Sequence, residues 1–156
     1  MSEVRILCES DLSQVAEIER LCFGEPWSEK SLELLLKDGN FGLVALCDGR
    51  VAAYVGVISV VPEGEITNVA THPDFRRCGL ASALLEALKR EASERGIESI
   101  FLEVRRSNTA ARELYEKQGF EVIGERKGFY SNPKEDAVLM VLAGRAIGQR
   151  SELVRT

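Results

Sequence analysis

The chain has 156 residues, of which 45% are hydrophobic and 29% charged, a composition typical of a globular protein and not of a disordered or fibrous one. Its length suits one hydrophobic core and no Pro-, Ser- or Gly-rich linker divides it, so we expect a single domain over 1–143 and a mobile or irregular tail over 144–156. The net charge of −5 disfavours nucleic acid as a partner, and the longest apolar stretch, Val51–Val61, is interrupted by Gly56 and too short to span a bilayer.

The first half of the chain predicts an antiparallel sheet preceded by two helices. Short apolar and β-branched runs are typical of strands, whereas apolar residues at three- to four-residue spacing are typical of amphipathic helices. Asp48-Gly49 between two apolar runs is the strongest hairpin signal in the sequence. In chain order we expect a strand over 4–7, a helix capped by Ser10, a helix capped by Ser28, hairpin strands over 41–47 and 51–61, a turn over 62–64 and a strand over 66–70.

The second half predicts alternating helices and strands. From Leu80 the apolar residues recur with a period near 3.6, which indicates an amphipathic helix running to about Gly96. After it we expect a strand over 99–104, a helix over 108–118, and strands over 120–126 and 137–142. Hairpins followed by a strand–helix–strand–helix–strand run indicate the α/β class, with a central mixed β-sheet flanked by helices.

The segment from Ala70 to Ala81 ends a strand, makes a basic turn and opens a helix. Gly79 falls at the helix start, where unpaired backbone N–H groups and the positive end of the helix dipole favour an anion. Gly79 has no side chain to block a phosphate, and Arg76 and Arg77 add positive charge. The pattern favours a pyrophosphate site, with plain helix capping as the alternative.

Glu103 lies in an otherwise apolar strand. Alternation places its side chain on the face opposite Leu102 and Val104, beside Phe101 and Arg105. One interpretation is an ion pair with an arginine at the strand end. The other is a general base that takes a proton from an attacking amine through water, since partial burial would raise the pKa of the carboxyl and strengthen it as a base.

Asn108 and Tyr115 are seven residues apart, which is two turns of one helix, so both can face the same cleft beside Glu103. Each also has a purely structural interpretation. Asn108 suits a helix cap, and Tyr115 suits a half-buried core position. The spacing is nevertheless the best internal indication of a site.

Three motifs resemble the GNAT family of N-acetyltransferases. They are Arg76-x-x-Gly79-x-Ala81, Glu103-Val104-Arg105-x-Ser107-Asn108 and Leu114-Tyr115-x-x-x-Gly119-Phe120. The sequence lacks the Gly-Lys-Ser/Thr of a Walker loop and the three spaced glycines of a dinucleotide site. Within the family the chain is most similar to the ribosomal-protein-alanine N-acetyltransferases (the RimI type), through Pro26-Trp27-Ser28, Asn68-Val69-Ala70, Leu102-Glu103-Val104-Arg105, and Tyr130 followed by Glu135-Asp136-Ala137. Ala81 stands where many relatives have a second glycine, and Phe129 where a second tyrosine is common.

The resemblance implies the GNAT acyl-CoA N-acyltransferase fold and acetyl-CoA as cosubstrate. It implies direct attack of the acceptor amine without an acyl-enzyme, with Glu103 as base and Tyr115 as the acid that protonates the departing thiolate. Val69, Ala70 and Thr71 would pair with the pantetheine arm through their backbones, as an added strand would. The remaining cofactor residues would be Arg76, Arg77, Cys78, Gly79, Leu80, Ala81, Ser82 and Asn108. Trp27, Phe129 and Tyr130 would line the acceptor groove, and Trp27 has a packing anchor as its structural alternative.

The implied acceptor is the N-terminal alanine of a small-subunit ribosomal protein, and an acidic chain is compatible with a basic partner. The alternatives are a GNAT enzyme for a small amine or a lysine side chain, and a non-catalytic acyl-CoA sensor. Such a sensor would need the phosphate-binding turn but neither Glu103 nor Tyr115.

The remaining sequence features indicate a cytoplasmic protein without a metal. Met1–Arg5 lacks the charged start and apolar core of a signal peptide. The four cysteines include no C-x-x-C pair and His72 is the sole histidine, so we expect free thiols and no zinc site. A nucleophilic Cys78 would lack a second histidine as its base, and we expect His72 to be a loop residue.

Overall fold

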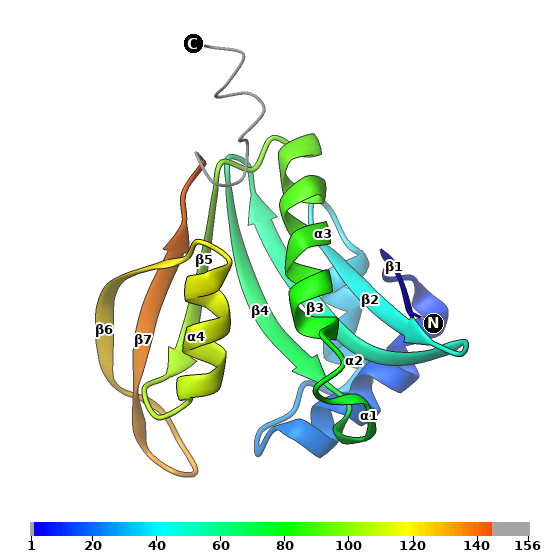
Figure 1. Ribbon diagram of the computed structural model, residues 1–156, viewed down its shortest axis with the longest axis horizontal. Helices are drawn as coiled ribbons and strands as arrows, with labels where there is room; N and C mark the ends of the chain where they lie inside the picture. Colours follow the sequence, from blue (N-terminus) through cyan, green and yellow to red (C-terminus); the bar gives the residue numbers. More distant parts are fainter. Residues whose placement is uncertain (1, 145–156) are drawn as a thin grey trace. The chain divides into compact units, whose positions relative to one another are not determined.

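The computed structural model describes residues 2–144. Its strands and helices, shown in Figure 1, are β1 (Ser2–Ile6), α1 (Leu12–Cys22), α2 (Glu29–Leu32), β2 (Phe41–Cys47), β3 (Arg50–Val60), β4 (Glu63–Thr71), α3 (Leu80–Glu94), β5 (Ser99–Arg105), α4 (Thr109–Lys117), β6 (Glu121–Tyr130) and β7 (Glu135–Leu142). Residues 145–156 of the predicted tail lie outside the described residues.

The seven strands form a mixed sheet in the order β1-β2-β3-β4-β5-β7-β6. β4 and β5 are parallel, whereas β1 with β2, β2 with β3, β5 with β7 and β6 with β7 are antiparallel. The predicted α/β class with a mixed sheet is confirmed. The chain divides into two compact units, the first made of residues 2–59 and 67–88 and the second of 60–66 and 89–144. The single domain over 1–143 stays a prediction.

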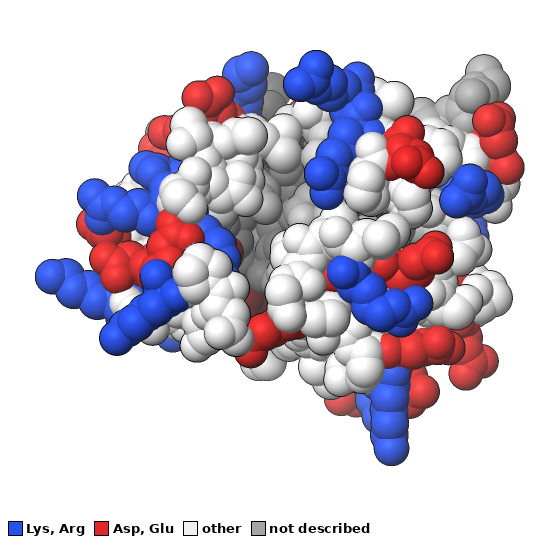
Figure 2. All heavy atoms as spheres, turned by 90° about the horizontal axis from the view of Figure 1, so that it is seen from below, with Lys and Arg blue, Asp and Glu red and all other residues white. Residues whose placement is uncertain are grey.

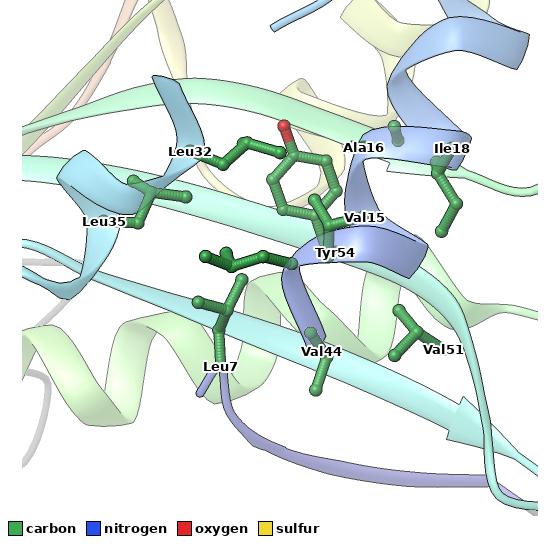
Figure 3. Close-up of a cluster of buried hydrophobic side chains, with 11 residues drawn as sticks. Leu7, Val15, Ala16, Ile18, Leu32, Leu35, Val44, Val51 and Tyr54 are labelled. Carbon is green, nitrogen blue, oxygen red and sulfur yellow. The ribbon is translucent and has the colours of Figure 1, made fainter. Parts of the chain in front are cut away.

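The core of the first unit has helices on both faces of β2 and β3. Val44 and Tyr54 are register partners and point to the same face, where α1 and α2 pack on them (Figure 3). Their neighbours Leu43 and Val55 point to the opposite face and are buried too. Figure 1 shows α3 on that opposite face. Strands covered on both sides explain why the hairpin sequence is apolar almost throughout.

In the second unit β5 alternates as expected. Ile100, Leu102 and Val104 are buried, whereas Phe101, Glu103 and Arg105 are half-buried. β7 lies between β5 and β6, and Glu103 is the register partner of Leu139 on β7. The sheet therefore presents Glu103 on the less covered face of β5.

The beginnings of the first two helices differ from the sequence prediction. Asp11, not Ser10, is the N-cap of α1, because a 3-10 turn over Glu9–Asp11 precedes the helix. The buried Asp11 carboxylate accepts hydrogen bonds from the Arg5 guanidinium at 2.8 and 2.9 Å and from the Cys8 N–H at 2.8 Å. Ser28 does cap α2, but that helix is a single turn followed by a 3-10 turn over Glu33–Leu36.

Strand boundaries were also predicted wrongly where strand pairing decides the end. The strand expected over 4–7 is Ser2–Ile6, because Ser2 pairs with Cys47. β4 begins at Glu63 because Glu63 pairs with Ser99, so the turn is at residues 61–62. β6 extends to Tyr130 and β7 begins at Glu135 because these two residues are register partners. Phe129 and Tyr130 therefore belong to a strand.

No helix within residues 2–144 is long and apolar enough to cross a membrane.

Candidate active site

The predicted site residues fall into two groups, one in each unit. The first unit holds Trp27, the β4 residues Val69–Thr71 and the turn from Arg76 to Ser82. The second unit holds Glu103, Asn108, Tyr115, Phe129 and Tyr130.

The turn before α3 has the backbone that an anion site requires. Arg77 and Gly79 have φ angles of 67° and 74°, and a Cβ on Gly79 would meet no atom within 4 Å. The first hydrogen bond of α3 runs from the Ala83 N–H to the Gly79 carbonyl oxygen at 3.1 Å. The N–H groups of Leu80, Ala81 and Ser82 precede it, so they point out of the helix start beside an open space.

The two arginines of this turn have different surroundings. The Arg76 guanidinium donates from Nε to the Thr71 carbonyl oxygen at 3.3 Å, and its Nη2 lies 3.4 Å from the Cys22 thiol. These contacts connect the turn to Thr71 at the end of β4 and to Cys22 at the end of α1. Arg77 and Cys78 are exposed at the turn itself.

β4 continues beyond its pairing with β5. The registered pairs are Glu63 with Ser99, Gly64 with Ile100 and Glu65 with Phe101, whereas β4 runs on to Thr71. The backbone of Val69 and Ala70 thus lies past the last registered pair. The Thr71 carbonyl oxygen accepts from the Cys22 thiol at 3.3 Å as well as from Arg76.

The two predicted residues at α4 also differ in surroundings. Asn108 is exposed and is the N-cap, because its Oδ1 accepts from the Ala111 N–H at 3.2 Å. Tyr115 is buried, with its ring centroid 5.6 Å from that of Phe120. Burial, and then the neighbouring Tyr130, raise the pKa of the Tyr115 phenol, which keeps it protonated at neutral pH.

Glu103 has an arginine partner on β6. Arg126 Nε lies 3.3 Å from Glu103 Oε2, and the Glu103 side chain is 17% exposed while that of Arg126 is 58% exposed. The structural interpretation of Glu103 predicts an ion pair with an arginine at the strand end. The ion pair is present, but its partner is Arg126 within β6, whereas Arg105 at the end of β5 pairs with Glu135 at 3.2 Å. Burial raises the pKa of Glu103, Arg126 opposes that effect and Glu65 adds to it. Of these, burial has the largest effect, so the carboxyl is a stronger base than an ordinary glutamate.

Tyr130 lies beside Glu103, so the structure brings two of the predicted residues together. Burial, and then the negative charge of Glu103, raise the pKa of Tyr130 to about 12. Phe129 packs edge-on against Tyr130 with the ring centroids 5.0 Å apart. Arg105 stacks over the Tyr130 ring at 4.5 Å and donates to the carbonyl oxygens of Ser131 and Pro133 at 2.9 Å each.

Arg126 and Glu65 were not predicted as partners of this group, whereas Arg105 was placed beside Glu103. Arg126 and Glu65 lie on strands other than β5, and only the strand pairing brings them near Glu103. Arg105 had a signal, since it is two residues from Glu103 and alternation places both on one face.

The cysteines and the single histidine lie outside the two groups of predicted site residues, except for Cys78 in the turn before α3. The four cysteines are free, as predicted, and His72 caps a 3-10 turn by accepting from the Asp74 N–H at 3.1 Å. No group of three His, Cys, Asp or Glu residues within residues 2–144 is placed to hold a metal ion.

Figure 2 shows positive and negative side chains interspersed on the face it presents.

Comparison with known proteins identifies the family. Residues 12–120 match the acetyltransferase (GNAT) family. The chain is 38% identical over 144 residues to the [ribosomal protein bS18]-alanine N-acetyltransferase of Salmonella typhimurium, covering 91% of this chain and 97% of that protein. It is 36% identical over 139 residues to a protein of Bacillus subtilis named as a putative enzyme of the same kind, covering 88% and 92%. The crystal structure of the ribosomal-protein-S18-alanine N-acetyltransferase from Escherichia coli superposes with a TM-score of 0.86 at 35% identity, covering 92% and 94%. This chain belongs to the GNAT family of acetyltransferases.

Proposed function

We propose that this protein transfers an acetyl group from acetyl-CoA to the N-terminal α-amine of a protein, and that its acceptor is the N-terminal alanine of a small-subunit ribosomal protein. The observation that carries this proposal is the similarity to bS18-alanine N-acetyltransferases along nearly their whole length, 97% in the Salmonella relative. A ribosomal acceptor implies that the reaction takes place in the cytoplasm.

The residues of the first unit fit acetyl-CoA. The outward N–H groups of Leu80–Ser82 and the open space at Gly79 suit a pyrophosphate, with Arg77 exposed beside them. The Val69–Thr71 backbone, which lies past the β5 pairing, suits the amides of a pantetheine arm. Asn108, already used as a helix cap through its oxygen, would contact that arm through its amide nitrogen. Bound there, acetyl-CoA supplies the thioester that carries the acetyl group.

Glu103 is the proposed general base. Its carboxylate takes one proton of the acceptor ammonium, directly or through water, and the freed nitrogen lone pair attacks the thioester carbon. The second N–H proton is lost to solvent as the carbon–sulfur bond breaks, and the proton that the acid gives to the sulfur is later replaced from solvent. Tyr115 is the proposed acid that returns a proton to the sulfur as the carbon–sulfur bond breaks. Because burial raises the pKa of Tyr115 further above that of a thiol, near 8.5, full proton transfer is uphill, and we propose that it proceeds as the thiol departs.

The acceptor is distinguished from a lysine side chain by the cost of deprotonation. An α-amine titrates at about 7.7–8.0 and a lysine at about 10.4, so at about pH 7.4 freeing the amine costs under ~1 kcal/mol in the first case and ~4 kcal/mol in the second. A single glutamate suits the first task. Trp27 in the first unit and Phe129 and Tyr130 in the second are the residues proposed to contact the acceptor.

Two peptides test this proposal against a lysine-directed enzyme. One begins with a free alanine, and the other is the same peptide with a blocked N-terminus and a free lysine. We expect the first to be acetylated at its α-amine and the second to be nearly inert, as followed by mass spectrometry and release of CoA. Equal rates on both would contradict the N-terminal assignment and leave only an amine acetyltransferase, and binding of acetyl-CoA without turnover of either peptide would favour the sensor.

A further inference from the structure

We propose that Glu19 is a positioning residue for the acceptor, because its buried carboxylate fixes the Trp27 segment to the sheet. This rests on the proposed function, in which Trp27 contacts the acceptor. All the residues concerned lie in the first unit.

Glu19 accepts hydrogen bonds from three different elements. The residue is completely buried on α1. Its Oε1 accepts from the Trp27 backbone N–H at 2.8 Å. Its Oε2 accepts from Asn68 Nδ2 on β4 at 2.9 Å and from the Tyr54 hydroxyl on β3 through a short hydrogen bond. The same side chain therefore joins the segment after α1 to two neighbouring strands.

The segment between α1 and α2 is attached at both ends to Glu19. Its first residue, Phe23, donates its N–H to the Glu19 carbonyl oxygen at 2.9 Å, and Trp27 donates to the Glu19 side chain. Gly24, Glu25 and Pro26 between them are exposed. The half-buried Trp27 side chain packs against the core cluster, so its place depends on where this backbone is held.

If this position in the core only had to be filled, a buried carboxylate would be less favourable in free energy than an apolar side chain. Burial of a charge is strongly unfavourable unless every oxygen is hydrogen-bonded, and an aliphatic side chain would pack there without that cost. Three hydrogen-bond donors converge on this site, so the group between them must accept on more than one atom and carry no donor of its own. Among side chains, an ionised carboxylate meets this requirement. Asn68 precedes Val69, so the same group ties the segment proposed to contact the acceptor to the strand proposed to bind the pantetheine arm.

Trp27 is the only tryptophan of the chain, so its fluorescence reports directly on the segment. In Glu19→Gln only one oxygen remains to accept, so it cannot serve both the Trp27 N–H and the Asn68 amide nitrogen, although the Tyr54 hydroxyl can accept from the new amide. We expect acrylamide to quench Trp27 more readily and the KM for the alanine-initiated peptide to rise about tenfold, the size expected for one hydrogen bond to a charged acceptor. The stabilisation by acetyl-CoA and kcat should change little.

Tyr54→Phe is the matched control. It removes a buried donor to Oε2 and leaves the Oε1 bond to Trp27 in place, so it should lower the melting temperature without changing Trp27 quenching or the peptide KM. If Glu19→Gln does not fold, Glu19→Asp carries the same test, because the shorter side chain keeps the charge but cannot reach all three donors.

A folded Glu19 variant with wild-type quenching and wild-type peptide KM would overturn the proposal, as would Tyr54→Phe if it changed both equally. Failure of the proposed function looks different. In that case the wild-type protein would not acetylate the alanine-initiated peptide, whereas Glu19→Gln would still change Trp27 quenching.

Discussion

Glu103 has both the ion pair of a structural residue and the partial burial of a base. The two are compatible because Arg126 is largely exposed and its charge is screened by water, whereas the carboxylate is mostly covered. The proposed mechanism requires Arg126 to leave the carboxylate when the ammonium group of the acceptor arrives.

Glu103→Gln tests the base directly. We expect turnover to fall by about 10²–10⁴-fold, the usual contribution of general acid–base catalysis, with the affinity for acetyl-CoA unchanged. The loss should be largest between the pKa of Glu103 and that of the acceptor amine, where the amine is protonated and the carboxylate is ionised, and smaller on either side. Steady-state rates and acetyl-CoA titration measure this.

Glu125→Gln is a suitable control because Glu125 also pairs with an arginine on the surface, Arg106. Its turnover should stay near the wild-type value. If the two variants lost turnover equally, Glu103 would be a structural residue.

Arg126→Met tests the electrostatic balance at Glu103. Arg126 favours the ionised carboxylate in the free enzyme, so its removal should raise the pKa of Glu103 and shift the acid limb of the kcat/KM profile to higher pH. The titration of the acceptor amine contributes equally to the wild-type and Arg126→Met profiles. The difference between the two profiles therefore reports the change in the pKa of Glu103. Lys127→Met removes a neighbouring positive charge that the structure does not pair with Glu103, and it should leave the limb in place. A shift to lower pH in Arg126→Met would contradict this balance.

The sequence correctly predicted the strand face of residues whose placement depends on local periodicity. Alternation was enough to place Glu103 on the less covered face of β5, but Arg126 could not be assigned to it because the pairing of β6 with β7 contains irregularities at residues 122–124 and 126–130. The unusual position of Glu19 could have been predicted from the sequence. It follows Val15 by four residues and so lies on the apolar face of α1, where a charged residue requires an explanation.

At the scale of elements, the turns were easier to predict than the strand ends. Asp48 and Gly49 have φ angles of 52° and 81°, as a tight hairpin turn requires, and β2 and β3 pair as expected. The start of β4 and the ends of β6 and β7 depend on pairing with strands distant in sequence. Such boundaries are set by tertiary hydrogen bonds, which no local pattern encodes.

The turn before α3 makes a prediction about acetyl-CoA binding. Gly79→Asp should abolish the acetyl-CoA-dependent rise in melting temperature, because it places a negative side chain against the proposed pyrophosphate site. Gly49→Asp is matched to it, since both glycines have positive φ and open space around the ideal Cβ. The backbone cost of about 1 kcal/mol is then common to both variants, and Gly49→Asp should keep the full ligand effect. Undiminished stabilisation of Gly79→Asp would refute the phosphate assignment.

At the scale of the whole molecule, the net charge of −5 works against an anionic cosubstrate. Positive and negative side chains are interspersed on the face shown in Figure 2, so no extended positive patch is visible on that face. On the proposed function, binding comes from local groups, namely the N–H groups at the start of α3 and the backbone of β4. The first group would bind phosphate and the second the pantetheine arm, so the two contributions would be separable by ligand.

Thermal unfolding with CoA and with pantetheine separates them. A ligand at about 100 times its Kd stabilises the folded chain by about 2.7 kcal/mol, which corresponds to a rise in melting temperature of about 5–10 °C for a protein of this size. CoA should reach this rise at far lower concentration than pantetheine, which lacks the pyrophosphate and gains only the strand-like pairing with Val69–Thr71. In Gly79→Asp the advantage of CoA over pantetheine should disappear, while any stabilisation by pantetheine remains. Equal potency of the two ligands in the wild-type protein would mean that the turn before α3 contributes nothing to binding and is only a helix cap.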